Sequence, residues 1–349
     1  MSAARSAAAR VAAVIVLAAG EGTRMKSDLP KTLHKVCGRT MLSHCLAAAA
    51  ELRPQRLIVV VGHHGDKVAA QVRDQQPDAI IVVQDHLGGT GHAVRVALEA
   101  VGTITGTVVV TYADTPLLRG STLDRLVAER ETSGTGATVL TVRAPDPTGY
   151  GRILRDSAGA FAGIVEHADA TPEQRSIDEI NSGMYAFDGV LLADAIKRTR
   201  TDNAQGEEYI TDTVCVLRDD GHLVVCVLAH DYEEVQGVND LAQLAHVSAV
   251  LNARLLADAM RAGVQVADPS STWVDVGVRL AAGAYIGPGT QLEGNTVVGA
   301  GARIGPGCLL RDTVVGAGAT VLDSFCENAD IGAGAEVGPF AHVKGGRVT

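Results

Sequence analysis

Runs of small and β-branched apolar residues alternate with amphipathic stretches over the first two thirds of the chain. The apolar runs are typical of buried strands, and they lie at 11–17, 57–61, 79–83, 108–112, 137–142 and 223–227. Apolar residues at helical spacing predict helices at 41–51, 91–100 and 123–131. Strands and helices that alternate in this way predict a doubly wound α/β domain.

A segment of leucine and valine residues at helical spacing precedes Gly263, which predicts one long helix that ends at this glycine. We interpret residues 240–263 as a linker helix between two domains. The first domain would then span 11–239 and the second 264–349. Residues 1–10, rich in alanine, arginine and serine, are predicted to form a disordered tail.

From Val274 onward, an aliphatic residue recurs at every sixth position. The series comprises Val274, Leu280, Ile286, Leu292, Val298, Ile304 and Leu310. The register then shifts by one residue to Val315 and Val321, is interrupted by an insertion around 327–330, and resumes at Ile331. A period of six fits neither a helix nor a single strand. It is typical of a parallel β-helix in which each hexad forms one side of a coil, and it predicts roughly four coils here.

The composition excludes several classes of protein. The chain has 349 residues, 46% of them hydrophobic, and can therefore bury more than one core. Its net charge of −10 argues against binding to nucleic acid or to an anionic membrane surface. The cysteines lack C-x-x-C spacing and predict neither a zinc site nor a disulfide framework. We interpret them as reduced thiols of a cytoplasmic protein.

The N-terminal region has the form of a signal peptide, because Arg5 and Arg10 precede the apolar residues 11–19. Cleavage would cut into a glycine turn that carries candidate chemistry, so we favour a retained strand. No apolar run reaches the ~20 residues that are needed to cross a bilayer. We therefore expect no membrane insertion.

The turn after the first strand joins glycines to cations. Gly20 and Gly22 allow a ligand to approach the backbone closely, and Arg24 and Lys31 can supply positive charge to phosphate oxygens. Neither the P-loop nor the three-glycine dinucleotide pattern is present, because Met25 stands where the third glycine is needed. A turn at the carboxyl end of a strand lies where open α/β sheets bind ligands. It predicts a triphosphate site of another kind; the alternative is a structural glycine turn with solvated cations.

Two more strand ends carry candidate ligand contacts. The strand at 108–112 is followed by Asp114, a carboxylate suited to hold Mg²⁺ together with water and phosphate oxygens. The alternative role for Asp114 is a helix N-cap. Gln84 and the glycine turn at 88–91 follow another strand and suit flat contact with a base, although this motif alone is a weak signal.

These motifs occur in a fixed order with several others farther along the chain. The set comprises residues 17–31, Gln84 with 89–90, and then 112–114, 148–152, 164–166, 181–185, 203–207 and 237–239. In this order, and followed by hexapeptide repeats, the sequence resembles the bacterial bifunctional N-acetylglucosamine-1-phosphate uridylyltransferase/glucosamine-1-phosphate N-acetyltransferase family. The resemblance covers about 12 to 343.

The resemblance implies UTP and N-acetylglucosamine 1-phosphate as substrates and Mg²⁺ as cofactor. Arg24 and Lys31 would be catalytic and face the phosphates, and Asp114 and Asn239 would bind Mg²⁺. Lys31 and Asn239 would also contact substrate. The other implied substrate-binding residues are Leu17, Ala18, Ala19, Gly20, Gln84, Gly89 and Thr90 for the uridine, Tyr112, Ala113 and Asp114 along the ribose and metal, and Gly151, Glu166 and Asn181 for the sugar.

It further implies a Rossmann-like nucleotidyltransferase domain, a left-handed β-helix, a homotrimer formed through that β-helix, and a role in making cell-wall precursors. Two alternatives remain open. The chain could use another sugar 1-phosphate, for example glucose 1-phosphate, or it could be a non-catalytic regulatory homologue.

The sequence departs from the family pattern at several positions. Ala113 stands where glycine is usual, Gly88 where leucine is usual, and Asp240 follows Asn239 where asparagine is common. An alanine that needed positive φ at 113 would be strained by about 1 kcal/mol. The acetyl-transfer residues of the family lie in coils beyond Thr349, so we expect this chain to lack acetyltransferase activity.

Overall fold

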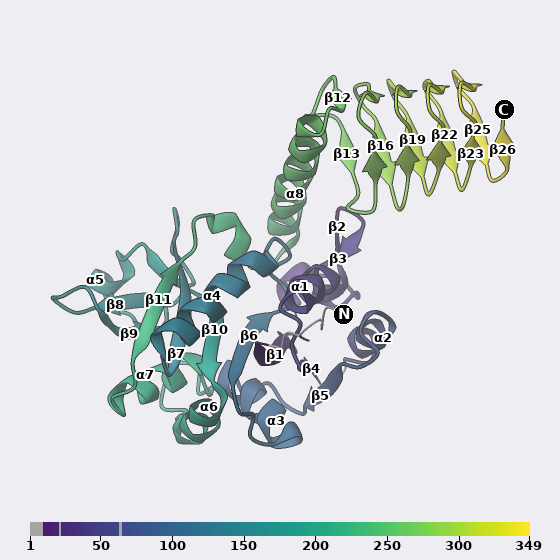
Figure 1. Ribbon diagram of the computed structural model, residues 1–349. Coiled ribbons are helices and arrows are strands. Elements are labelled where there is room, and N and C mark those ends of the chain that lie inside the picture. The colour runs from purple at the N-terminus through teal and green to yellow at the C-terminus, as the bar shows by residue number, and fades with distance from the viewer. Residues whose placement is uncertain (1–9, 21, 63–64) are drawn as a thin grey trace, which may run out of the picture. The chain divides into compact units, whose positions relative to one another are not determined.

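The computed structural model describes residues 10–20, 22–62 and 65–349 (Figure 1). The chain divides into two units, one formed by residues up to 34 with 41–241 and the other by 35–40 with 242–349. The uninterrupted first domain that we predicted is therefore wrong at 35–40. Residues 35–40 form a hairpin that belongs to the second unit. Within that unit, the Val276 N–H donates to the carbonyl of Cys37 at 3.1 Å.

The predicted tail lies mostly outside the described residues, because 1–9 are not among them. Arg10 is described, and its guanidinium donates to Glu131 at 2.6 Å and to Asp124 at 3.0 Å. Disorder was therefore the wrong prediction for Arg10, which contacts the helix Gly120–Ser133 (α4).

Among the described residues, nine strands form the sheet of the first unit, in the order β11-β7-β10-β6-β1-β4-β5, with β8 paired to β10 and β9 to β8. The strands are Val11–Ala18 (β1), Arg56–Gly62 (β4), Ile80–Gln84 (β5), Thr107–Tyr112 (β6), Ala137–Arg143 (β7), Arg152–Arg155 (β8), Phe161–Val165 (β9), Glu179–Asp188 (β10) and Val224–Leu228 (β11). The helices are Met41–Glu51 (α1), Asp66–Gln75 (α2), Thr90–Val101 (α3), Gly120–Ser133 (α4), Pro172–Arg175 (α5), Gly189–Ala195 (α6) and Ile210–Asp219 (α7), with 3-10 helices Thr23–Met25 (η1), Lys31–Leu33 (η2), Ile196–Arg198 (η3) and Tyr232–Val235 (η4).

All six predicted strands are present within one or two residues, and β1 pairs in parallel with both β4 and β6. The sequence pattern missed β8, β9 and β10. Of these, β10 runs antiparallel between β6 and β7. Asn181, Ser182 and Gly183 resemble a turn in the sequence, yet they lie inside this buried strand. Gly183 has φ +84, which produces a register shift at this point in the pairing with β7.

The sheet separates two apolar layers because successive side chains of a strand point to opposite faces. Along β1, Val14, Val16 and Ala18 join one core, whereas Ala13, Ile15 and Leu17 join the other. The first core packs against α1, α2 and α4, and the second against α3, α6 and α7. Helices lie on both faces of the sheet (Figure 1), so a central strand such as β1 is buried on both sides and apolar along its length, as the sequence pattern predicted.

The second unit consists of the hairpin strands Lys35–Val36 (β2) and Arg39–Thr40 (β3), the helix Leu241–Arg261 (α8) from residue 242 onward, and three stacked parallel sheets. The strands of the sheets are Gln265–Val266 (β12), Tyr285–Ile286 (β15), Arg303–Ile304 (β18), Thr320–Val321 (β21) and Glu336–Val337 (β24); Trp273–Val274 (β13), Gln291–Glu293 (β16), Leu309–Arg311 (β19), Phe325–Glu327 (β22) and His342–Lys344 (β25); and Arg279–Leu280 (β14), Val297–Val298 (β17), Val314–Val315 (β20), Asp330–Ile331 (β23) and Arg347–Val348 (β26). These sheets confirm the predicted left-handed parallel β-helix.

The predicted interruption around 327–330 is wrong. Leu292 pairs with Leu310, Leu310 with Cys326, and Cys326 with Val343, so the stacking continues through this segment. Cys326 is fully buried and takes the inward position that aliphatic residues occupy in the other coils. The coil is shorter here. The periodicity of aliphatic residues did not reveal this coil, because a cysteine takes the inward position.

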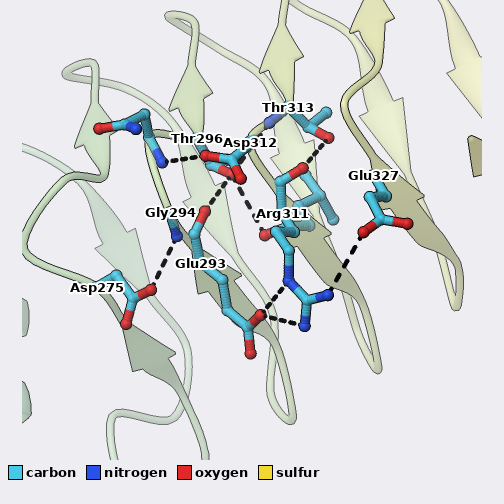
Figure 2. A network of polar contacts seen from close by, with 10 residues as sticks. Asp275, Glu293, Gly294, Thr296, Arg311, Asp312, Thr313 and Glu327 are labelled. Atoms are coloured by element: carbon cyan, nitrogen blue, oxygen red, sulfur yellow. Dashed lines mark hydrogen bonds and ion pairs between the residues drawn. The ribbon is translucent and has the colours of Figure 1, made fainter. Parts of the chain in front are cut away.

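A polar column follows the outside of one β-helix sheet (Figure 2). Arg311 contacts Glu293 at 2.7 Å in the coil before it and Glu327 at 3.5 Å in the coil after it. The carboxylate of Asp275 accepts the Gly294 N–H at 2.8 Å, and that of Asp312 accepts the Asn295 N–H at 2.8 Å. Exposed ion pairs contribute about 0–1 kcal/mol each, whereas a buried aliphatic side chain contributes ~1.5–3 kcal/mol. The interior therefore holds the coils together, and the polar column fixes their turns.

Across the described ranges, no helix is long and apolar enough to cross a membrane. None of the six cysteines is joined in a disulfide.

Candidate active site

A cavity of 270 Å³ lies at the carboxyl ends of β1, β5 and β6. Its lining includes most positions that the sequence assigned to the uridine and phosphates, namely Leu17, Ala18, Ala19, Gly20, Lys31, Gln84, Gly89, Thr90, Tyr112 and Asp114. Parallel strands carry their carboxyl ends to one edge of the sheet, which explains why segments distant in sequence meet here. We refer to this space as the nucleoside cavity. A larger cavity of 680 Å³ shares residues 18–20 and Gln84 with it.

One wall of the nucleoside cavity is fixed by Gln84 at the end of β5. Its amide Nε2 donates to the carbonyl of Gly89 at 3.2 Å and lies 2.8 Å from Nδ1 of His92. Burial lowers the pKa of His92, which favours its neutral form. Gly89 has φ +100, and a Cβ there would lie 2.5 Å from the carbonyl oxygen of Glu208. Only glycine fits at this position, so the second glycine turn is required by geometry.

A polar cluster stands at the open side of the cavity. The ammonium Nζ of Lys31 lies 2.5 Å from Oδ2 of Asp114 and donates to Oδ1 of Asn239 at 3.2 Å. The Val238 N–H donates to the Asp114 carbonyl at 2.9 Å, which brings the segment before Asn239 beside the end of β6. Gly22 has φ +65, and a Cβ there would lie 2.4 Å from Cβ of Lys31. The glycine turn therefore makes room for the lysine.

A second cavity, also of 270 Å³, contains all three predicted sugar-binding residues, Gly151, Glu166 and Asn181. We refer to it as the sugar cavity. The Thr211 hydroxyl donates to Oε1 of Glu166 at 3.0 Å, and burial raises the pKa of this carboxyl. The Asn181 amide donates to the Tyr185 hydroxyl at 2.7 Å, and its own oxygen accepts the N–H of Gly183 at 3.1 Å. These side chains are held in place before any ligand arrives.

The two cavities share a wall. Thr90, Tyr112, Asp114 and Glu207 line both of them. The Tyr112 ring packs directly against Gly183, because a Cβ at that residue would lie 2.4 Å from a ring carbon. Ligands in the two cavities would therefore meet beside Asp114, next to the Lys31 ammonium. This arrangement suits a transfer between two bound substrates.

Two predicted site residues are placed differently from the rest. Arg24 is exposed on η1 and is not among the described residues that line either cavity. Ala113 is fully buried in the apolar core, and its N–H donates to the Leu17 carbonyl at 3.0 Å. Its φ is not positive, so the strain that we considered at this position is absent. The methyl group of Ala113 packs in the apolar core.

Sequence reasoning missed several residues of the sugar cavity. Thr211 orients Glu166, and Tyr209 lines the cavity while its hydroxyl donates to Gln205 at 2.7 Å. They follow the 203–207 segment directly, so extending that motif by four residues would have included both.

Asp114 and Asn239 fit a small divalent cation. Both direct a side-chain oxygen at the Lys31 ammonium, so the two oxygens already converge on one positive charge. Two oxygen ligands suit Mg²⁺, which keeps water and phosphate oxygens in its other positions. Within the described part of the chain, no group of three or more His, Cys, Asp or Glu side chains could hold a metal. A metal here would take its other ligands from water and substrate oxygens.

Comparisons with known proteins agree with this geometry. Residues 14–177 match the MobA-like NTP transferase domain, and residues 277–312 match the bacterial transferase hexapeptide (six repeats). The bifunctional protein GlmU of Thermobifida fusca is 57% identical over 329 residues, which cover 93% of this chain and 68% of the relative. Bifunctional protein GlmU of Streptomyces avermitilis is 54% identical over 341 residues, 97% of this chain and 71% of the relative. The bifunctional protein GlmU of Corynebacterium glutamicum is 45% identical over 338 residues, which cover 96% of this chain and 70% of the relative. The chain therefore belongs to the GlmU family and is a nucleotidyltransferase.

Proposed function

We propose that the first unit transfers UMP from UTP to N-acetylglucosamine 1-phosphate, giving UDP-N-acetylglucosamine and pyrophosphate. The observation that carries the proposal is the shared wall of the two cavities, where Tyr112 and Asp114 stand beside the Lys31 ammonium. UTP would occupy the nucleoside cavity and the sugar phosphate the sugar cavity. Such a product is a precursor for cell-wall synthesis.

The reaction needs positioning and charge neutralisation more than proton transfer. A phosphate oxygen of the sugar 1-phosphate attacks the α-phosphorus of UTP, and the bond from that phosphorus to the pyrophosphate oxygen breaks. Because the attacking oxygen is already anionic, no general base is required. Lys31 would neutralise phosphate charge, and Arg24 would assist from η1. Mg²⁺ held by Asp114 and Asn239 would supply further neutralisation of the triphosphate.

Substrate selectivity would come from the sugar cavity. Glu166 can accept a hydrogen bond from a sugar hydroxyl, and Asn181 can both donate and accept. Burial makes these contacts stronger than they would be in water. The alternative, another sugar 1-phosphate such as glucose 1-phosphate, would leave the polar groups that face an acetamido group without partners.

Three further expectations remain proposals. The stacked hexapeptide coils support assembly of a homotrimer through the second unit. Lack of acetyl transfer by this chain of 349 residues stays a prediction, tested by CoA release from acetyl-CoA with glucosamine 1-phosphate. A cytoplasmic location also stays a prediction.

Pyrophosphate release tests the proposed function. The assay combines UTP with N-acetylglucosamine 1-phosphate, and parallel reactions replace the sugar phosphate by glucose 1-phosphate or UTP by CTP. We expect release to be fastest with the first pair and to stop when EDTA removes Mg²⁺. Faster release with glucose 1-phosphate would contradict the proposed sugar, and undiminished release in EDTA would contradict the metal.

A further inference from the structure

Arg152, the first residue of β8, is a buried cation without a buried anion. Its exposed fraction is 1%, and none of the described carboxylates forms an ion pair with it, although the charge of Asp146 partly offsets the lowering of its pKa. One terminal nitrogen donates to the carbonyl of Tyr150, and the other donates to the carbonyl of Arg175 at 3.3 Å. The second nitrogen also lies 3.4 Å from Nδ1 of His167, while Nε has no partner within the described chain.

This environment is unfavourable for a guanidinium on its own account. Burying a charge without a paired opposite charge is costly, and burial together with the nearby Arg175 lowers the pKa of Arg152. Arg155 on the same strand shows the ordinary arrangement, because its guanidinium contacts the carboxylate of Glu179 at 2.6 and 2.8 Å. Arg152 has this less favourable arrangement, which indicates a role other than stabilising the β8–β9 hairpin.

The contacts of Arg152 lead to segments that line or adjoin the sugar cavity. Tyr150 and Gly151 form one wall, and the Gly151 carbonyl accepts the N–H of Asn181 at 2.9 Å. His167 directly follows Glu166, which lines the same cavity beside Gly151. Arg175 ends the short helix α5, whose N-cap Thr171 forms a capping box with Gln174. The planar guanidinium thus joins three segments by donors that hold a fixed angle.

We propose that Arg152 is a positioning residue for the sugar 1-phosphate, because its guanidinium ties the Tyr150–Gly151 segment to the segment that follows Glu166 and to the end of α5. It does not itself touch substrate, since it is buried behind these walls. The inference rests on the proposed function and names the residue that shapes its second substrate site. A purely structural arginine would affect folding without distinguishing between the two substrates.

Steady-state pyrophosphate release, with each substrate varied in turn, tests this inference. Glutamine in place of Arg152 keeps amide donors but cannot join three segments, so Arg152→Gln should raise KM for the sugar 1-phosphate by about tenfold, the effect of losing one to two buried hydrogen bonds. KM for UTP should change by less than about twofold. The matched control is Arg155→Gln on the same strand, which should lower Tm with neither KM altered.

A second variant keeps the test decisive if Arg152→Gln does not fold. Arg152→Lys retains the charge and one donor but loses the planar fork, and it should raise KM for the sugar by about threefold. Equal changes in both KM values, or a sugar-specific change in Arg155→Gln, would overturn the inference. Absence of turnover by the wild-type protein with every sugar 1-phosphate would overturn the proposed function and the inference with it. Normal wild-type turnover with an unselective Arg152→Gln would overturn the inference alone.

Discussion

The two cavities of the first unit differ in how the chain builds them. The nucleoside cavity lies where parallel strands of the sheet end, and its lining includes small residues of the turns after β1 and β5, such as Ala19, Gly20 and Gly89. The sugar cavity is assembled from a hairpin, an antiparallel strand and the segment before α7, and buried polar side chains line it.

This difference separates two ways of forming a site. In the nucleoside cavity the fold supplies much of the shape, because strand ends of a parallel sheet converge there, and Gln84 holds the Gly89 turn in place. In the sugar cavity each buried polar group needs a partner of its own, such as Thr211 for Glu166 or Tyr185 for Asn181. The second kind of site depends on many contacts and should be the more sensitive to single substitutions.

The largest expected effect is at the point where the cavities meet. Lys31→Ala should lower kcat by about 10²- to 10³-fold, since removing one preorganised charged group has this effect in other enzymes. Asp114→Asn should have a similar effect, because it removes the carboxylate that the ammonium faces at 2.5 Å. Rapid-quench turnover with both substrates saturating measures this. A kcat within threefold of wild type, roughly the scatter expected of a residue without a role, would contradict the placement of the reaction.

Gly183→Ala tests how Tyr112 is positioned, since its ring packs against Gly183 and lines both cavities. The new Cβ would lie 2.4 Å from the tyrosine ring at a residue with φ +84, so strain and overpacking together should cost about 2–4 kcal/mol of unfolding free energy. Both KM values should rise because the shared wall shifts. Gly159→Ala is the control: its φ is +82 but nothing lies within 4 Å of its Cβ position, so it should cost only about 1 kcal/mol. Equal losses in urea melts of the two variants would show that Tyr112 is not held in this way.

A crossed pair of variants tests whether the cavities are separate sites. Gln84→Ala should raise KM for UTP by about tenfold and leave KM for the sugar phosphate nearly unchanged, because it removes the amide that fixes the Gly89 turn. Glu166→Gln should do the reverse. Both KM values come from the same initial-rate assay. A variant that raised both KM values equally would indicate that the two cavities form a single site.

The smallest expected effect is on how the free energy of unfolding depends on pH. Burial raises the pKa of Glu166 above its ordinary value of 4.5, so the folded protein binds more protons than the unfolded chain just above that pH. The stability contributed by protonated Glu166 is full below 4.5 and is lost as pH rises through the raised pKa. Glu166→Gln removes this dependence, and the variant should be the more stable of the two at pH 7. Urea melts from pH 4 to 8 measure the difference, and a wild-type protein more stable than the variant at pH 7 would contradict it.

The fold was largely predictable from the sequence, because periodicity reports burial. The buried strands of the parallel sheet and the hexads of the β-helix each repeat a pattern that few other structures produce. The failures have local causes. Asn181 to Gly183 look like a turn but lie in β10, since their polar groups find partners inside the protein. Cys326 is an inward residue that no aliphatic pattern includes.

The candidate site was predictable in two different degrees. The turn at 17–24 carries its own chemistry, so the residues indicated a phosphate site without further help. Glu166 and Asn181 lack any local pattern and were reached only through the resemblance to a family. Arg152 was not assigned a role at all, because a buried arginine that bonds carbonyls is indistinguishable in sequence from one on the surface. Contacts between distant segments, which define the sugar cavity, cannot be read from local order.

The most direct test is a crystal structure of the protein with UDP-N-acetylglucosamine. The account predicts the uracil in the nucleoside cavity beside Gln84 and Gly89, and the N-acetylglucosamine in the sugar cavity beside Glu166 and Asn181. The diphosphate should lie between them, next to Lys31 and Asp114. A sugar bound in the 680 Å³ cavity on the other side of Gln84, or a diphosphate away from Lys31, would contradict it.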